Sequence, residues 1–299
     1  MKRLLILTRY PGEYEPQRLK QEAEGQNLKA KVLSYKRISL TWDDSGVNVF
    51  LGGKKELFGY HYLIPRAASK KGESLVALKT ALIGLLKKNQ RCLNQETFLR
   101  YPLTSKMFQG ITLAQLGLPV IPSFVFNNRE EWQQFLAKER LKFPLIIKAV
   151  FGSHGRQVKL VRQWRQANEF LGQEQWSSVI AQPLIESRFW LRVLVLGDRI
   201  LGAVARKTKT RFLIGGGVKV DHTGKSFSLD QAGEEICLRA ARALKSDFCG
   251  LDLIPDPKEG WLIIEVNRTP QFKIFEQKTD FNVAAQIIQF LTQPASSLT

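Results

Sequence analysis

The amino-acid sequence predicts an α/β protein whose C-terminal half is of the α+β type. Two observations lead to this prediction. The chain opens with a buried-looking strand, a helix and a second strand, an order that is typical of a parallel sheet. The second half instead contains neighbouring strand runs joined by short turns, which indicates antiparallel pairing.

Residues 1–95 are expected to form an N-terminal α/β domain. Gly25 ends its first helix, and Gly52-Gly53-Lys54 separates two alternating runs, which is a hairpin signal. The expected elements are strand 3–8, helix 16–26, strand 29–35, a hairpin within 46–60, strand 62–66 and helix 73–88.

The rest of the chain is expected to divide into a central unit (96–178), a C-terminal unit (179–293) and a frayed tail (294–299). We expect Thr104 to cap the first helix, and Gly197-Asp198 to form a two-residue hairpin turn. The expected elements are helix 104–119, strand 120–126, helix 129–139, two strands within 143–161, helix 164–174, strands 179–185, 190–197 and 199–207, helix 231–244, strands 248–256 and 260–267, and helix 282–293.

The composition is that of an ordinary globular protein. The chain has 299 residues, of which 44% are hydrophobic and 24% charged. Its three cysteines show no CxxC spacing, which favours a reducing compartment. The first apolar run is too short for a signal peptide, and no run reaches the roughly 18 residues of a membrane span. We therefore expect a cytoplasmic protein without a membrane partner.

The net charge is strongly positive. The chain carries 45 Lys and Arg against 27 Asp and Glu, which gives +18. Such a field attracts acidic partners, such as a nucleotide, an acidic protein segment or a nucleic acid. The charge is spread along the chain and shows no zinc-finger spacing or basic tail, so nucleic acid is an alternative partner that we do not favour.

Two neighbouring strands in the last third carry oxygen donors. Glu265 and Asn267 lie two apart at the end of a strand and therefore point to the same face. If the preceding strand pairs with it around the turn PDPKEG, Asp252 lies opposite Glu265. Two carboxylates at that distance repel unless a cation neutralises them. A divalent metal ion would do so, and a neighbouring Lys or Arg would do so equally well.

Lys148 and a glycine turn are candidates for binding phosphate. Lys148 interrupts an apolar strand run, where a charge is costly unless it is paired or reaches solvent. The turn 152–156 (GSHGR) offers backbone N–H groups, although it is also compatible with a simple hairpin. It is neither a Walker A loop nor a Rossmann fingerprint.

Other cations could hold phosphate or carboxylate, although each alone is more often a solvated surface charge. These are Lys106, Arg192, Arg206, Lys207 and Arg211. No GxSxG motif supports a serine nucleophile, and the three histidines lack the HExxH zinc spacing.

Several motifs together are similar to one known superfamily. They are LIPRAA near residue 65, LIIKAVFGSHGRQVKLV, AQPLIES, LRVLVLGDRILGAVARK, CGLDLI and LIIEVNRTPQF. In these motifs and in their order the chain resembles the ATP-grasp superfamily and, within it, the RimK-type ligases that add glutamate to a ribosomal protein. The resemblance implies an ATP-grasp fold preceded by a Rossmann-like α/β domain.

The resemblance also implies roles for individual residues. Asp252, Glu265 and Asn267 match the family's Mg²⁺ ligands, with Mn²⁺ as an alternative ion. Arg192 and Arg206 match arginines that face the phosphates and the acyl group. The residues that would bind ATP are Lys106, Lys148, the turn residues Gly152, Ser153 and Gly155, the hinge residues Gln182, Pro183, Leu184 and Ile185, and Arg211.

The implied activity is ATP-dependent ligation of a carboxylate to an amine through an acylphosphate. The expected partners are ATP, an amino acid such as glutamate, and an acidic peptide or protein acceptor, while an oligomer is left open. The chain departs from the family at Pro183, Trp190 and the apolar run 212–214. Trp190 and the run 212–214 keep in view a nucleotide-binding protein without ligase activity, and the charge of +18 keeps in view a basic nucleic-acid-binding protein on the same scaffold.

Overall fold

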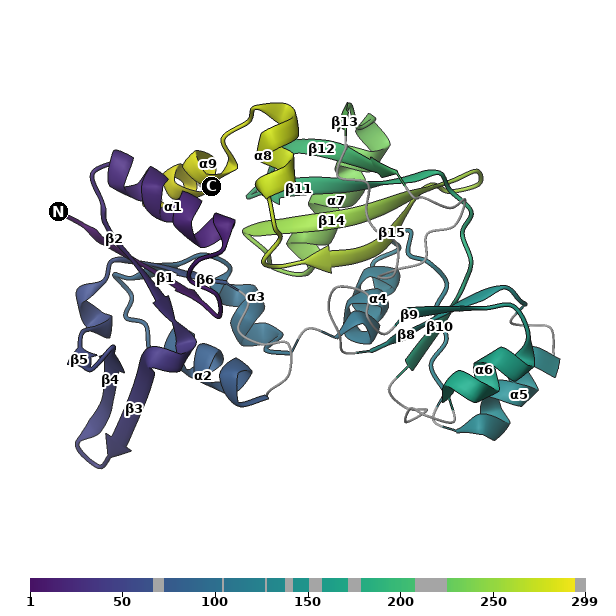
Figure 1. Cartoon of the computed structure of the whole chain (residues 1–299), viewed down its shortest axis with the longest axis horizontal. Coiled ribbons are helices and arrows are strands. Elements are labelled where there is room, and N and C mark those ends of the chain that lie inside the picture. Colours follow the sequence, from purple (N-terminus) through teal and green to yellow (C-terminus); the bar gives the residue numbers. More distant parts are fainter. Residues whose placement is uncertain are drawn as a thin grey trace.

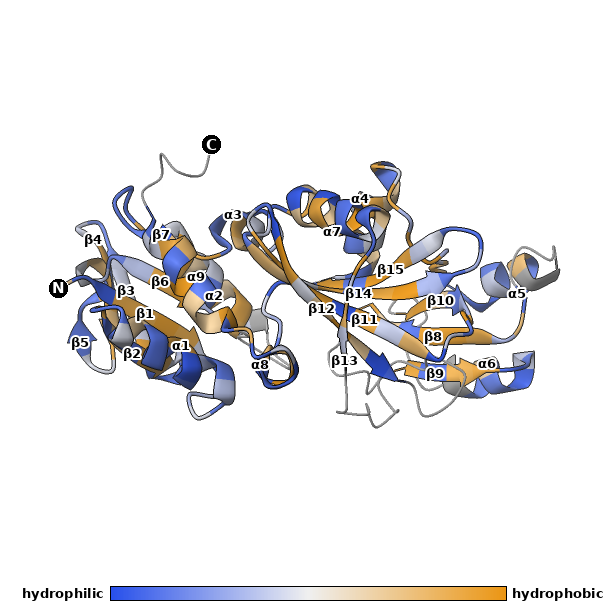
Figure 2. Ribbon diagram, turned by 90° about the horizontal axis from the view of Figure 1, so that it is seen from above, coloured by the Kyte–Doolittle hydropathy of each residue, from blue (hydrophilic) through white to orange (hydrophobic). Residues whose placement is uncertain are grey.

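The structure is a computed structural model that describes residues 1–66, 73–103, 105–126, 128–137, 142–150, 158–171, 179–207 and 225–293. Within these residues the strands form four sheets, and helices cover most of their faces (Figure 1). The mixed helix and sheet architecture expected from the sequence is confirmed. In Figure 2 the inner strands are mainly hydrophobic, while the helices are hydrophilic on their outward sides.

The N-terminal sheet is parallel, as the opening strand-helix-strand order predicts. Its order is β2-β1-β6-β7, with β1 (Arg3–Thr8), β2 (Lys29–Ser34), β6 (Tyr62–Pro65) and β7 (Arg91–Cys92). Leu4 and Ile6 point to one face of β1, and Leu5 and Leu7 to the other, and all four are buried. A parallel sheet covered on both faces requires such a continuous apolar strand.

Helices from both ends of the chain cover one face of this sheet. They are α1 (Tyr14–Gly25) and α9 (Val283–Thr292), which pack against each other and share a core with Leu4 and Ile6. The opposite face is covered by α2 (Glu73–Gly84), by α3 (Gln95–Arg100) and by a small antiparallel sheet. Helix α2 ends at Gly84, whereas the sequence predicted a helix over 73–88.

The small antiparallel sheet has the order β3-β4-β5. Its strands are β3 (Ile38–Asp43), β4 (Gly46–Leu51) and β5 (Lys54–Lys55). The hairpin predicted at Gly52-Gly53 is confirmed, and both glycines have positive φ angles, which glycine adopts at little cost. Strand β3 follows a 3₁₀ turn at Tyr35–Arg37 and was not predicted from the sequence.

The central part forms a three-stranded sheet of order β10-β8-β9. Its elements are α4 (Lys106–Gln115), α5 (Arg129–Ala137), β8 (Leu145–Ala149), β9 (Val158–Val161), α6 (Trp164–Leu171) and β10 (Val179–Pro183). Two expectations were wrong. Residues 120–126 form isolated bridges at Val120 and Phe124 and no continuous strand, and Ser105 caps α4 by accepting a hydrogen bond from the Phe108 N–H. Thr104 lies outside the described residues.

The C-terminal sheet is antiparallel and has the order β13-β12-β11-β14-β15. Its elements are β11 (Phe189–Leu196), β12 (Arg199–Lys207), β13 (Lys225–Phe227), α7 (Gln231–Ala243), β14 (Phe248–Asp256), β15 (Gly260–Asn267) and α8 (Lys273–Thr279). The predicted turn at Gly197-Asp198 is confirmed. Helix α7 covers one face, and on the other face Leu194, Leu196 and Val204 pack with Phe272 and with Phe275 of α8.

Buried polar side chains join the N-terminal and C-terminal parts. The Asn94 amide donates to the carbonyls of Phe248 and Arg268 and accepts from the Phe248 N–H. Arg66 donates to the Pro270 carbonyl, and the Glu15 carboxylate accepts from the N–H groups that begin α8. The division at residues 95, 178 and 293 remains our proposal.

Candidate active site

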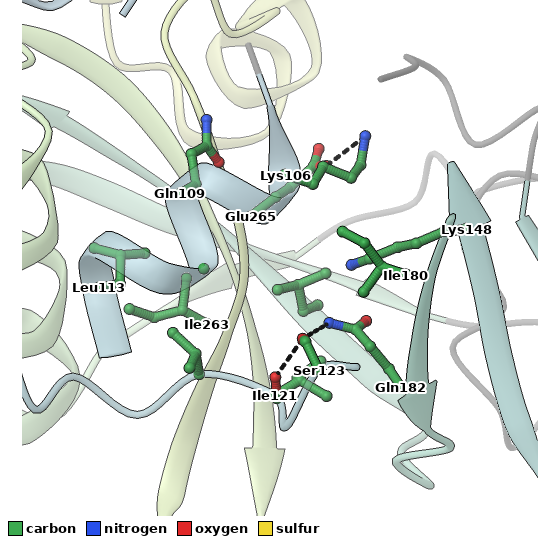
Figure 3. Close-up of a pocket in the computed structure, with 13 residues that line it drawn as sticks. Lys106, Gln109, Leu113, Ile121, Ser123, Lys148, Ile180, Gln182, Ile263 and Glu265 are labelled. Carbon is green, nitrogen blue, oxygen red and sulfur yellow. Dashed lines mark hydrogen bonds and ion pairs between the residues drawn. The ribbon is translucent and has the colours of Figure 1, made fainter. Parts of the chain in front are cut away.

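A pocket opens where α4, the β8-β10 strands and β15 meet (Figure 3). It holds about 360 Å³ of space when its opening to solvent is counted. The lining residues are Lys106, Gln109, Gly110, Leu113, Val120, Ile121, Ser123, Lys148, Ile180, Gln182, Ile263, Ile264 and Glu265.

One face of α4 lines the pocket. Lys106, Gln109, Gly110 and Leu113 follow the i, i+3, i+4, i+7 spacing that places residues on a single helix face. The Gln109 amide donates to the Val266 carbonyl at 3.0 Å and accepts from the Val266 N–H at 3.3 Å, so it continues the ladder of β15. This pair of bonds fixes α4 against the strand that carries the predicted metal ligands.

The β14–β15 hairpin places Asp252 opposite Glu265, as predicted. From the turn outward, Asp256 pairs with Gly260, and an uninterrupted ladder in that register would place Ile264 opposite Asp252. The register shifts by one residue between Asp252 and Leu253, so Ile264 is the extra residue of a β-bulge. The bulge therefore brings the two carboxylates face to face.

Both carboxylates are paired with cations. Arg192 lies opposite Asp252 on the neighbouring strand β11 and donates twice to it, from Nε at 2.5 Å and from Nη2 at 2.9 Å. Lys106 Nζ lies 3.6 Å from Glu265 Oε2, and the Asn267 amide donates to Glu265 Oε1 at 2.9 Å. The sequence left open whether a metal ion or a basic side chain neutralises the two carboxylates, and in this structure Arg192 and Lys106 do so.

Burial and pairing shift the pKa values of these groups. Burial raises the pKa of Asp252 to about 6, and Glu265 contributes to this rise while Arg192 opposes it. Burial alone would also raise the pKa of Glu265, but Lys106 and the Asn267 amide outweigh it and hold this pKa below its usual range. Glu265 is therefore ionised at neutral pH.

Lys148 is buried on β8, with 6% of its surface exposed, and its amine points into the space between the sheets (Figure 3). Burial lowers the pKa of Lys148 to about 8, with Lys106 adding to the effect and Glu265 opposing it. Among the residues that the structure describes, no carboxylate lies within ion-pair distance of this amine. Such a buried cation suits an anionic ligand.

Arg206 is a second cation without a described carboxylate partner, and it is half-buried. It lies opposite Trp190 in the β11–β12 ladder, and its guanidinium stands 5.0 Å from the centre of the indole ring. Its buried Nε has no hydrogen-bond partner within the described ranges. Burial lowers the pKa of Arg206 to about 10, and Arg192 adds to this.

The predicted hinge residues end β10 and follow it. The Gln182 amide donates to Ser123 Oγ at 2.7 Å, and this hydroxyl donates to the Ile121 carbonyl (Figure 3). Pro183 pairs with Leu145, and the Leu184 N–H donates to the Pro144 carbonyl. Ile185 packs on the small cluster formed by Ile121, Ile254 and Leu262.

Four predicted ATP contacts cannot be placed. Gly152, Ser153 and Gly155 of the glycine turn, and Arg211, lie outside the described residues. The same holds for the apolar run 212–214.

The donor set fits the predicted metal ion. Two carboxylates and a carboxamide lie on one sheet face, and such oxygen donors suit Mg²⁺. Within the described ranges, no group of three or more His, Cys, Asp or Glu side chains is gathered that could hold a metal, and the trio here contributes only two carboxylates. The metal site therefore remains a prediction.

The sequence analysis missed several lining residues. Gln109, Gly110 and Leu113 share the helix face of Lys106, and helical spacing from Lys106 would have identified them. Ser123 gave no comparable signal, because residues 120–124 reach the pocket only through their bridges to β15 and β10.

Comparison with known proteins defines the family. The model of the RimK-like ATP-grasp domain matches residues 104–291. The chain belongs to this family, and its enzyme class is that of the ATP-dependent ligases. ATP binding is typical of the fold.

Individual relatives and structures agree with this assignment. A probable alpha-L-glutamate ligase of Mannheimia succiniciproducens is 27% identical over 99% of this chain and 100% of its own length. The glutamate–LysW ligase ArgX of Sulfurisphaera tokodaii is 26% identical over 59% of this chain and 64% of its own length. The ATP-grasp ligase PsnB, complexed with a minimal precursor, superposes with a TM-score of 0.76 at 16% identity and covers 96% of this chain and 97% of its own. This last likeness confirms the ATP-grasp fold.

None of the helices in the described part of the chain is long and apolar enough to cross a membrane.

Proposed function

We propose that the protein joins an amino acid such as glutamate to a peptide or protein through an ATP-derived acylphosphate. The observation that carries the proposal is a pair of cations without an ion-pair partner among the described residues. Lys148 is buried in the pocket, and Arg206 is half-buried with a buried Nε near the ion pair of Asp252 with Arg192; no described carboxylate lies within ion-pair distance of either. Burying an unpaired charge costs free energy, which a bound polyphosphate would offset.

The apolar part of the pocket suits the adenine ring. Leu113, Ile121, Ile180 and Ile263 surround the space beside Lys148 (Figure 3). The hydroxyl of Ser123 and the amide of Gln182 add polar groups at its edge. An apolar slot with a few fixed polar groups is the usual arrangement for a nucleotide base.

The carboxylate row would bind the metal between the phosphates. Asp252, Glu265 and Asn267 are the proposed ligands of Mg²⁺, which would neutralise charge on the transferred phosphate. Arg192 holds the Asp252 carboxylate by two hydrogen bonds and therefore fixes its orientation before any ligand binds. Lys106 does the same for Glu265.

The proposed chemistry has two steps. An oxygen of the substrate carboxylate attacks the terminal phosphorus of ATP, and the bond to ADP breaks. The acceptor amine then attacks the carbonyl carbon, the bond to phosphate breaks, and the amine proton passes to solvent. Lys148 and Arg206 would hold the reacting groups in line and spread the negative charge, which is the main source of rate acceleration in phosphoryl transfer.

The acceptor is proposed to be acidic. The net charge of +18 raises encounter rates with an acidic peptide or protein, and the relatives named as glutamate ligases indicate an amino-acid substrate. A release of ADP that rises with acidic peptides and falls steeply with salt would agree with this. Equal rates with neutral and acidic peptides would contradict it.

The decisive experiment is calorimetric titration with ATP, with and without Mg²⁺. We expect binding that requires Mg²⁺ and is lost in the double variant Asp252→Asn/Glu265→Gln. Glu235→Gln, which changes an exposed carboxylate on α7, is the matched control and should bind normally. ATP binding that is indifferent to Mg²⁺ and to the double variant would refute the proposed metal site. ADP release is then screened against amino acids and peptides.

A further inference from the structure

The outer edge of β3 has no backbone partner in the described part of the chain. Strand β3 pairs with β4 on one side, and no backbone hydrogen bond reaches its other side. Exposed edges usually carry a lysine, a proline or a bulge that prevents pairing with another strand. The sequence of β3, ISLTWD, has none of these, and its register with β4 is regular.

The pattern of hydrogen bonds shows which residues face this edge. The Gly52 N–H donates to the Arg37 carbonyl, so the backbone groups of Arg37 point toward β4. In an antiparallel ladder this direction alternates along the strand. The N–H and C=O groups of Ile38, Leu40 and Trp42 therefore point outward and are able to bond another strand.

The two faces of strand β3 differ in polarity. Ile38, Leu40 and Trp42 share one face with the buried residues Val49 and Leu51 of β4. At the far end of that face Trp42 is 75% exposed and its cross-strand neighbour Val47 is 39% exposed. Arg37, Ser39, Thr41 and Asp43 lie on the other face.

We propose that β3 pairs antiparallel with β3 of a second copy, so that the two small sheets form one continuous sheet across a twofold axis. Only one register covers the whole strand and keeps the outward groups opposite each other. It places Leu40 opposite the partner's Leu40, Trp42 opposite the partner's Ile38, and Asp43 opposite the partner's Arg37. The apolar face is then continuous, and an oppositely charged pair closes each end.

This interface is independent of the active-site proposal. In Figure 1 the β3–β4 hairpin lies at the N-terminal end of the molecule, away from the α4, β8 and β15 elements that line the pocket. The dimer would therefore leave both pockets open.

The test is sedimentation analysis of the full chain across a concentration series. We expect a monomer–dimer equilibrium in which nearly all of the protein is dimeric at about 50 µM. Trp42→Pro removes only an outward N–H and an exposed ring, and should raise the dissociation constant at least about tenfold while the fold is kept. A chain that stays monomeric at that concentration, or a dimer that Trp42→Pro leaves unchanged, would overturn the proposal.

Charge exchange tests the register itself. Asp43→Arg alone places two arginines at each end and should weaken the dimer about fivefold. Adding Arg37→Asp should restore it, although the double variant still lacks the hydrogen bond from the Ser45 N–H to Asp43 that supports the turn. No recovery in the double variant would refute this register.

A second exposed apolar patch supplies the control. It consists of Leu103, Met107, Phe108 and Ile111 on and beside α4. Ile111→Lys should leave the dimer intact. Loss of the dimer in this variant would move the interface to α4 and would contradict the pairing through β3.

Discussion

Two groups of charged side chains at the site are held in opposite ways. On the C-terminal sheet each carboxylate has a cation, Asp252 with Arg192 and Glu265 with Lys106. Lys148 on β8 is buried and Arg206 on β12 is half-buried, and no described carboxylate forms an ion pair with either. Matched charges offset each other's desolvation in the folded chain, whereas unmatched cations cost free energy until an anion binds. We therefore propose that the first set serves folding as well as binding, and that the second serves binding alone.

The largest expected effect comes from breaking a matched pair. Asp252→Ala leaves the Arg192 guanidinium buried without its partner and should lower the free energy of unfolding by about 3–5 kcal/mol. Thermal unfolding of the purified variant measures this. The double variant Asp252→Ala/Arg192→Met should lose less than Asp252→Ala alone. A double variant less stable than the single one would show that the pair is not the source of the effect.

A buried cation away from the pocket tests whether every unmatched charge signals a ligand. Lys79 lies over the Phe98 ring, where its amine is 4.0 Å from the ring centre, and burial lowers its pKa to about 7. In the unfolded chain this pKa is about 10.4. The cost of the charge is therefore complete below pH 7 and declines as pH rises from 7 toward 10.4.

Lys79→Met should accordingly stabilise the protein by about 3 kcal/mol at pH 6, and the gain should shrink at pH 9. Chemical unfolding at the two pH values measures it. ATP affinity should stay unchanged, since Lys79 is not among the residues that line the pocket. The exposed Lys88→Met is the control and should show no pH-dependent gain. A loss of stability in Lys79→Met would mean that the charge is satisfied where it lies.

Lys148→Met should combine a gain in stability with a loss of affinity. Removing the unmatched amine should stabilise the ligand-free protein by about 2 kcal/mol. The same change should weaken ATP binding at least about tenfold, because a charge-assisted contact to phosphate is lost. Unfolding and calorimetry on one preparation measure both. Lys159→Met on the neighbouring strand β9 changes an exposed lysine and should do neither. A destabilised Lys148→Met would place this residue with the matched charges.

The smallest effect is expected at the apolar side of the pocket. Gly110 lies within α4 and lines the pocket, and a Cβ added to it would meet no protein atom within 4 Å. Gly110→Ala should therefore raise stability by about 0.5–1 kcal/mol through helix propensity. It should also weaken ATP binding severalfold, because the methyl group enters the space proposed for the base.

Binding of inorganic tripolyphosphate, which carries no base, distinguishes the part of the site proposed for the phosphates from the part proposed for the base. Its binding should be unaffected by Gly110→Ala and reduced by Lys148→Met. Gln115→Ala, at the exposed end of the same helix, is the propensity control and should not change affinity. Equal ATP affinity in Gly110→Ala and the unchanged chain would place the base elsewhere.

The sequence pattern predicted the arrangement of Asp252, Glu265 and Asn267 only in part. The turn after Asp252 and the strand alternation at Glu265 and Asn267 together predicted that the carboxylates face each other. The route to that arrangement could not be read from the sequence, because the bulge at Ile264 is set by packing of the finished sheet. Arg192 was predicted to contact substrate, but its pairing with Asp252 depends on β11 lying beside β14, and the whole of α7 separates these strands in the chain.

Long apolar strands and helices with clear spacing were placed close to their observed ends. Strand β3 was missed because its alternation is short and starts directly after a 3₁₀ turn. Residues 120–126 carry an apolar run typical of a strand, yet they contact two different sheets by single bridges. In both cases the tertiary surroundings decide the outcome, and the sequence within a short window does not contain them.

The packing of α9 against α1 has a consequence for how the chain matures. The face of the N-terminal sheet that carries Leu4 and Ile6 is covered partly by Val283, Ile287 and Ile288 near the other end of the chain. During synthesis the first strands leave the ribosome long before these side chains exist, so that face stays partly uncovered until translation is nearly over. The sheet whose first strands are made earliest is thus among the last parts of the fold to be completed, and any shortening of the chain before α9 would expose it to aggregation.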